Sequence, residues 1–292
     1  MEEEHIENSL INLNVKKEIV LEHREDVTAV YLYSYYMAEA TIAEKLIGLR
    51  DTDNIKEIKK LKQELKRLEE ASSIELSEKQ KEALEMVNKE NVCVITGGPG
   101  TGKTTVIKSM IELYEEKGKK VVLCAPTGRA AKRMTEATGK EAKTLHRLLE
   151  IGKIEDESMK NSLKAEITPI DADVIIVDEV SMVDVFLMNY LVKAIYKGTK
   201  LILVGDADQL PSVGPGSVLK DIIDSGAIAT IHLDTIFRQA AKSKIIVNAH
   251  RVNEGQTFLT KEEAEELGSK EDFFYIRPNT RGRNGVSSRI PK

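Results

Sequence analysis

The chain of 292 residues carries 43 lysines and arginines against 48 aspartates and glutamates, a formal net charge of −5, and has no tryptophan. A hydrophobic share of 41% is ordinary for a globular chain, and the length suggests one large domain plus a smaller piece. With 18 glycines and 7 prolines the composition excludes collagen-like and low-complexity proteins. The net charge excludes a uniformly basic nucleic-acid binder, although it permits one basic groove on an acidic body.

The compartment is indicated by the cysteines and by the apolar runs. Cys93 and Cys124 both lie in apolar runs, where a free thiol behaves as a small hydrophobic side chain. Residues 1–14 begin with acidic residues and hold no apolar core of signal-peptide length. No stretch reaches the ~18 consecutive apolar residues that a membrane-spanning helix needs. We therefore expect a reduced, cytoplasmic protein that has no membrane partner.

Residues 1–75 are expected to form a small, mainly helical N-terminal segment. Residues 27–43 begin with β-branched and aromatic residues and then become helix-like, which predicts a short strand or turn followed by a helix that ends near Gly48. Within 56–70, apolar residues recur at helical spacing among lysines and glutamates. This pattern predicts an amphipathic helix.

The pattern changes at Ser77, which with Gln80 fits the N-cap and third position of a capping box. Short apolar runs then alternate with segments long enough for helices, which is typical of a parallel sheet buried on both faces. The expected strands are 92–96, 121–125, 173–178 and 200–205, and the expected helices include 104–117 and 184–197. Residues 76–240 are therefore predicted to form a doubly wound α/β domain, in which ligands bind beyond the carboxyl ends of the strands.

The first expected strand is followed by GGPGTGKT, which matches the phosphate-binding pattern G-x-x-x-x-G-K-[ST] in full. Glycines let successive N–H groups turn toward a phosphate, and the following helix adds its positive N-terminal end. Lys103 is predicted to reach the β- and γ-phosphates, and Thr104 is predicted to ligate Mg²⁺. The residues predicted to bind the nucleotide are Gly98, Pro99, Gly100, Thr101, Gly102, Lys103, Thr104 and Thr105.

Acidic and amide side chains follow the other central strands. Asp178, at the tip of its strand, can hold the metal ion, while the adjacent Glu179 can polarise an attacking water, so the pair predicts hydrolysis. Beyond the next strand stands Gln209, whose two-sided amide can sense a γ-phosphate or orient water. Arg238 follows a further apolar stretch, where a surface or interdomain salt bridge is the simpler interpretation of the residue by itself.

Seven motifs together carry a family resemblance: LSEKQ, GGPGTGKTT, APTGRAAKRM, TLHRLL, VIIVDEVSM, LVGDADQLPSVGPG and IFRQ. In this order and spacing, from about Val27 to about Asn253, the chain closely resembles a RecD-type DNA helicase of superfamily 1. The resemblance implies a RecA-like P-loop ATPase fold, ATP and Mg²⁺ as cofactors, and single-stranded DNA as a partner. It also implies 5′-to-3′ helicase activity in repair or recombination.

The resemblance further implies roles for single residues. Gln80 would read the adenine edge, and Glu179 would be the catalytic base. The residues implied to hold MgATP are Lys103, Thr104 and Asp178. Those implied to contact the γ-phosphate and couple it to movement are Gln209 and Arg238. Those implied to lie along single-stranded DNA are Pro126, Thr127, Arg129 and His146.

Two of the DNA-facing residues can also be weighed on their own chemistry. Arg129 belongs to a short basic helix whose N-terminus follows a strand, which suits phosphate contacts, although a solvated charged face explains it too. His146 taken alone would more simply cap a helix end or satisfy a core carbonyl. Aromatic platforms for stacking bases are scarce.

The chain departs from the family pattern at its end. No second glycine-rich or strand-rich lobe is recognisable after Phe237. Residues 241–292 are expected to hold the truncated start of that lobe, with a strand at 272–276 and a disordered tail. We therefore expect that a missing lobe or a partner chain completes the ATP site.

Two other functions stay open. A nucleotide- and DNA-binding module with little or no turnover is expected if the second lobe supplies a catalytic arginine. An unrelated P-loop ATPase, such as a nucleotide kinase or a DNA-packaging motor, is disfavoured by the motifs GDADQLPSVGPG and IFRQ.

Overall fold

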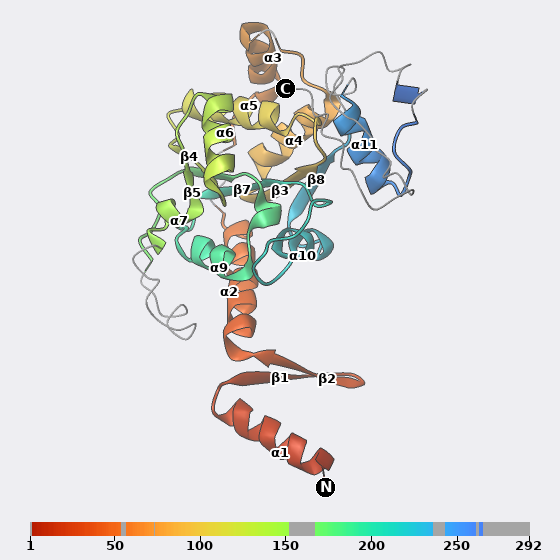
Figure 1. Ribbon diagram of the computed structural model, residues 1–292. Coiled ribbons are helices and arrows are strands. Elements are labelled where there is room, and N and C mark those ends of the chain that lie inside the picture. The colour runs from red at the N-terminus through yellow and green to blue at the C-terminus, as the bar shows by residue number, and fades with distance from the viewer. Residues whose placement is uncertain are drawn as a thin grey trace. The chain divides into compact units, whose positions relative to one another are not determined.

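The computed structural model describes residues 2–53, 57–72, 74–151, 167–235, 243–260 and 263–264. The chain divides into two compact units, Met1–Phe237 and Arg238–Lys292 (Figure 1). In the second unit the described part is mainly one helix, α11 (Lys244–Asn253), which Ser243 caps through its hydroxyl. None of the helices in the described ranges is long and apolar enough to cross a membrane. The rest of the description concerns the first unit.

The N-terminal part begins with helix α1 (Glu2–Val15), an antiparallel hairpin of β1 (Ile19–Arg24) and β2 (Val27–Leu32), and helix α2 (Tyr33–Arg50). The strand and helix expected from residues 27–43 are confirmed, with the helix ending at Arg50 rather than near Gly48. Helix α1 and strand β1 were not predicted. Helix α2 buries one side in the core of the α/β domain, so this helix packs against the layer that contains the sheet.

The helix expected over 56–70 is shorter than its apolar spacing suggests: α3 spans Leu61–Ser72. Lys60 adopts a φ of 58°, in the left-handed region, where a right-handed helix cannot continue. Ile58 is buried in a loop, where its backbone N–H donates to Asn88 Oδ1 at 2.8 Å. The expected helix start was therefore wrong, because tertiary contacts of a loop bury the first apolar residue of the pattern.

The centre of the domain is a six-stranded sheet in the order β5-β4-β6-β7-β3-β8, and every neighbouring pair is parallel. Its strands are β3 (Val92–Gly97), β4 (Val121–Ala125), β5 (Ala142–Thr144), β6 (Val174–Val177), β7 (Lys200–Gly205) and β8 (Ala229–Leu233). The four predicted strands are confirmed as the middle of this sheet. The two edge strands, β5 and β8, were not predicted, because neither is apolar along its whole length.

Alternate residues of each central strand point into two separate apolar cores. Val92 and Val94 of β3 belong to one core, while Cys93 and Ile95 belong to the other. The first core is covered by α2, α7 (Leu145–Leu148), α9 (Val185–Lys193) and α10 (Val218–Asp224). The second is covered by α3, α4 (Glu78–Lys89), α5 (Lys103–Glu115) and α6 (Gly128–Thr138) (Figure 1). This two-sided burial confirms the predicted doubly wound fold.

Helix α9 ends at Lys193, four residues before the predicted end of the segment 184–197. The chain must reverse there to enter β7, and Gly198 supplies the turn with a φ of 93°. Thr199 stabilises this turn, because its hydroxyl donates to the Ala172 carbonyl at 2.9 Å.

A buried lysine at the start of β7 caps helix α4. Lys200 is 8% exposed, and its Nζ donates to the backbone carbonyls of Val87, Asn88 and Glu90. Carbonyl groups at a helix C-terminus have no partner inside the helix and carry partial negative charge, so a cation stabilises them. Burial lowers the pKa of Lys200 from its ordinary value. A single side chain thus joins the sheet to the helix that precedes the first strand.

Replacing Lys200 with methionine, which keeps most of the apolar stem, should lower the free energy of unfolding by about 2–3 kcal/mol, because charged hydrogen bonds to helix carbonyls are lost. Urea unfolding followed by circular dichroism measures this. The matched control is Lys197→Met, at an exposed lysine of the preceding turn. Equal stability of the two variants would contradict the capping role.

A second buried polar side chain, unlike Lys200, has no hydrogen-bond partners among the described residues. Asn189 of α9 is fully buried, and within the described part of the chain neither its Oδ1 nor its Nδ2 has a hydrogen-bond partner. An unpaired buried amide costs about 1–3 kcal/mol of folding free energy.

Replacing Asn189 with leucine, which is similar in shape and has no polar group to leave unpaired, should therefore raise the thermal midpoint of unfolding. Asn189→Asp should lower it, because a buried charge would be left without a partner. A lower midpoint for the leucine variant would show that this amide makes favourable polar contacts.

Candidate functional site

The loop between β3 and α5 has the form of a phosphate-binding loop. Gly100 and Gly102 adopt φ values of 80° and 83°, which only glycine reaches without strain. The Thr101 hydroxyl donates to the Gly98 carbonyl at 2.8 Å and holds the loop closed on itself. Gly102 is the N-cap of α5, so the loop leads into a helix N-terminus that attracts anions. The predicted strand, loop and helix are all confirmed.

Lys103 lies at the first position of α5, and its ammonium group is directed back over the loop. Its Nζ donates to the carbonyl oxygens of Gly97 at 2.5 Å and Gly98 at 3.0 Å. The positive charge therefore lies against the carbonyl groups at the start of the loop. The neighbouring Thr104 is exposed, so its hydroxyl is accessible to a ligand.

Asp178 follows β6 directly and is mostly enclosed by protein. Burial raises the pKa of this carboxyl to about 6, against the lowering effects of the Glu179 N–H and of the Lys103 charge. The Glu179 N–H donates to Asp178 Oδ1 at 2.9 Å and fixes the orientation of the carboxylate. A cation bound beside Asp178 would relieve this desolvation, because it favours the ionised form.

Glu179 itself has a left-handed backbone, with φ 54° and ψ 42°. This conformation is costly for a residue other than glycine and is found preferentially where function fixes a side chain. It starts the short turn η2 (Val180–Met182), which follows β6.

Residues from three elements converge on one pocket of about 480 Å³. Thr104 comes from α5, Asp178 and Glu179 follow β6, and Arg133 comes from α6. A hydroxyl and a carboxylate that share one cavity are oxygen donors of the kind that Mg²⁺ prefers, with water and phosphate as its further ligands. The residues present therefore fit a magnesium ion. The structure brings together Thr104, Asp178 and Glu179, which the motifs predict to be metal ligands and base.

Hydrogen bonds join the loop after β7 to the end of β3 and to the turn after β6. The Ala207 N–H donates to Thr96 Oγ1, at the end of β3, at 3.1 Å. The Ser181 hydroxyl, in η2, donates to Gln209 Oε1 at 3.4 Å. Sequence reasoning predicted Gln209 but missed Thr96, the last residue of an expected strand, and Ser181, which lies within the motif VIIVDEVSM. Their hydroxyls connect the ends of β3, β6 and β7.

Gln80 is fully buried and forms the predicted capping box with Ser77. Its Oε1 accepts from the Ser77 N–H at 3.0 Å, and its Nε2 donates to the Gly102 carbonyl at 3.3 Å. The side chain thus joins the start of α4 to the N-cap of α5. Contact with adenine stays a prediction beside this structural role.

The residues predicted to lie along DNA follow β4 and β5, at the same carboxyl edge of the sheet as the phosphate loop but on the β5 side of it. Thr127 caps α6, since its Oγ1 accepts from the Ala130 N–H at 3.2 Å. Arg129 on α6 and His146 on α7 are both exposed, whereas Pro126 is buried. Because β4 and β5 are neighbours in the sheet, these residues share one edge of the domain. Arg238 lies outside the described residues.

The sheet order, the phosphate-binding loop and the acidic residues after β6 define a RecA-like P-loop domain. The family model described as "AAA domain" matches residues 80–215. The chain is 43% identical over 181 residues to the ATP-dependent RecD2 DNA helicase of Deinococcus radiodurans, covering 62% of this chain and 24% of that protein. It is 35% identical over 231 residues to the RecBCD enzyme subunit RecD of Mycobacterium tuberculosis, covering 70% and 38% respectively.

A further relative is the ATP-dependent DNA helicase dda of Enterobacteria phage T4, 36% identical over 149 residues, with 49% of this chain and 34% of that protein covered. Among solved structures, the Pif1 helicase of Candida albicans matches with a TM-score of 0.48 and 26% identity over 66% of this chain and 47% of that one. The predicted resemblance is confirmed: over its nucleotide-binding region, this chain is similar to RecD-type DNA helicases. It spans 24% and 38% of the length of the two RecD-type relatives.

The bond between Gln80 and Gly102 gives a prediction for the free protein. Gln80→Ala should lower the free energy of unfolding by about 1–2 kcal/mol, because the capping box and the bond to the loop are both lost. Chemical unfolding without nucleotide measures this, with Lys79→Ala as the control, at the preceding, partly exposed residue, which forms only a surface ion pair with Glu82. Unchanged stability of the Gln80 variant would mean that the residue matters only for the ligand.

Proposed function

We propose that this chain forms the first motor lobe of a 5′-to-3′ DNA helicase, which binds ATP with Mg²⁺ and couples its hydrolysis to movement along single-stranded DNA. The observation that carries the proposal is the shared pocket of Thr104, Asp178 and Glu179 beside the loop that holds Lys103. A phosphate-binding loop alone would indicate binding. A partly buried carboxylate and a glutamate with a strained backbone, both lining the same pocket, support hydrolysis as well.

The nucleotide-binding steps follow from the positions of the side chains. The loop N–H groups and the N-terminus of α5 bind the phosphates, while the Lys103 ammonium exchanges loop carbonyls for phosphate oxygens. The Thr104 hydroxyl and the Asp178 carboxylate would hold Mg²⁺, which would neutralise phosphate charge. The remaining residues assigned to the phosphate loop are Gly98, Pro99, Gly100, Thr101 and Thr105, with Gln80 at the adenine.

The chemical step is assigned to Glu179, which accepts a proton from the water that attacks the γ-phosphate. Gln209 is assigned to the γ-phosphate, and its bond to Ser181 places it next to the turn that carries Glu179. Arg238 is proposed to assist from beyond β8. Movement along DNA would follow when the loop that carries Gln209 changes position as ATP is bound and hydrolysed.

Single-stranded DNA is proposed to bind along Thr127, Arg129 and His146, with Pro126 shaping the backbone between them. This path starts at the ends of β4 and β5, on the same edge of the sheet as the phosphate loop. The curated relatives are named as DNA helicases, and RecD is named as a subunit of the RecBCD enzyme. Repair or recombination, in the cytoplasm, is therefore the proposed setting.

A second candidate function is a nucleotide- and DNA-binding module with little turnover by itself. The observation that favours it is the partial coverage of the RecD-type relatives, 24% and 38% of their length. A second lobe or a partner chain would then complete the ATP site.

The proposal predicts different defects for two variants of the site. Lys103→Ala should weaken binding of a fluorescent ATP analogue at least about tenfold, because a charged phosphate contact is lost. Glu179→Gln should bind the analogue normally but release phosphate about 100- to 1,000-fold more slowly, because the general base is lost. Phosphate release with and without single-stranded DNA gives the second readout. If wild-type turnover is itself negligible, the second candidate function holds.

The control is the thermal midpoint without nucleotide, which should stay within about 2 °C for Lys103→Ala because the lysine lies outside the core. A large loss of stability would instead make the lysine a structural residue. Normal ATP binding by this variant would contradict the proposed site.

A further inference from the structure

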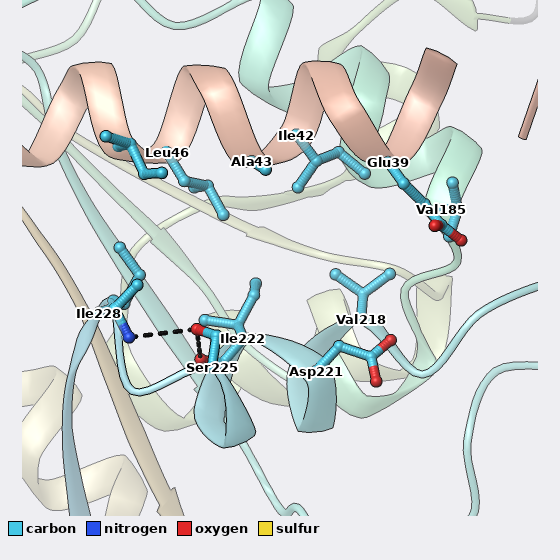
Figure 2. A pocket seen from close by; sticks show the side chains of 12 residues that line it. Glu39, Ile42, Ala43, Leu46, Val185, Val218, Asp221, Ile222, Ser225 and Ile228 are labelled. Atoms are coloured by element: carbon cyan, nitrogen blue, oxygen red, sulfur yellow. Dashed lines mark hydrogen bonds between the residues drawn. The ribbon is translucent and has the colours of Figure 1, made fainter. Parts of the chain in front are cut away.

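An apolar pocket of about 330 Å³ lies between helices α2 and α10, and none of its lining residues belongs to the nucleotide site (Figure 2). Ile42 and Leu46 of α2 face Val218 and Ile222 of α10 across it. Ile47, also on α2, lines the pocket and remains 41% exposed, so apolar surface continues outward from the opening. Apolar side chains of a ligand would be removed from water on entering this pocket, which is favourable.

The turn that follows α10 closes one end of this pocket. Arg50 Nη1 donates to the Ala227 carbonyl at 2.9 Å and ties the end of α2 to this turn. The Ser225 hydroxyl donates to the Ile222 carbonyl at 2.7 Å and accepts from the Ala227 N–H at 3.2 Å (Figure 2). These bonds pair the polar groups of the turn among themselves, so the closed end is preformed and offers mainly apolar contacts.

The other end carries two carboxylates that approach from opposite helices. Glu39 lies on α2 and Asp221 on α10, and both side chains are drawn at the same end of the pocket (Figure 2). Both residues are exposed, but partial desolvation, together with the negative charge of Asp221, raises the pKa of Glu39 from its ordinary value. Within the described ranges neither carboxylate forms an ion pair. This end of the pocket therefore favours a positive charge.

We propose that this pocket binds a segment of a partner protein in which aliphatic side chains adjoin a lysine or arginine. The aliphatic side chains would lie between Leu46 and Ile222, and the cation would lie between Glu39 and Asp221. Charge complementarity selects this occupant, because a neutral apolar segment would leave two like charges unrelieved and an acidic one would add to them. The exposed Ile47 favours a polypeptide over a small amine, since it extends the contact beyond the pocket.

The probe is a set of short fluorescein-labelled peptides, each with two leucines and one lysine at a different spacing. Matched peptides carry glutamate for the lysine. Fluorescence anisotropy measures binding, and amide chemical shifts of α2 and α10 locate it. At least one lysine peptide should bind saturably with shifts at these helices, and its glutamate counterpart should not.

Two variants of the protein separate charge from shape. Glu39→Gln with Asp221→Asn should weaken peptide binding at least about tenfold, while Ala43→Phe, which fills the pocket and keeps both charges, should abolish it. The control is Glu44→Gln with Asp224→Asn, which removes carboxylates of the same two helices that do not line the pocket. Thermal midpoints check that each variant folds.

The proposal is overturned if no lysine peptide binds saturably, or if the control pair weakens binding as much as the Glu39 and Asp221 pair. Sedimentation would reveal the alternative occupant, a second copy of this chain, as a dimer that Ala43→Phe dissociates. That result would also overturn the proposal. The experiment contains no nucleotide, so its failure leaves the proposed ATPase site unaffected.

Discussion

Burial of the parallel sheet on both faces is the constraint on which the rest of this domain depends. The helices that cover the two faces also connect one strand to the next, and each returns the chain to the opposite edge of the sheet. All strands therefore run in the same direction, and all their carboxyl ends lie at one edge. The register of the strands determines which loops are neighbours. Because Thr96 of β3 pairs with Gly205 of β7, the loops that follow these two strands start side by side. Polar loops therefore gather at this edge, whereas the apolar residues of the strands are divided between two cores.

Glycines allow the loops to approach one another at this edge. A Cβ added to Gly97 would lie 2.5 Å from the Leu233 carbonyl oxygen, at the end of β8. One added to Gly205 would lie 3.3 Å from the Val180 and Ser181 backbone nitrogens, in the turn after Glu179. A side chain at Gly97 would push the end of β8 away, and one at Gly205 would crowd Leu219 and the turn after Glu179. The close packing fixes the positions of the phosphate loop, the pair Asp178 and Glu179, and the loop of Gln209 relative to one another. Little reorganisation is therefore needed when a ligand binds.

Much of this arrangement could be predicted from local sequence. The continuous apolar runs of β3, β4, β6 and β7 and the capping signal at Ser77 each depend on neighbouring residues, and each was confirmed. What could not be predicted depends on tertiary contacts: the loop that buries Ile58, the Lys200 cap and the unpaired amide of Asn189. The edge strands carry no continuous apolar signal. The pocket between α2 and α10 joins residues almost 200 positions apart, and no motif connects them.

The central claim is that nucleotide binds where β3, β6 and β7 end, and amide hydrogen exchange with and without MgADP tests it most directly. The account predicts slower exchange in the presence of MgADP within residues 98–105, 178–182 and 206–210. Exchange at the pocket between α2 and α10 should stay unchanged. Protection confined to other segments, or none under conditions in which MgADP binding is saturated, would contradict the account.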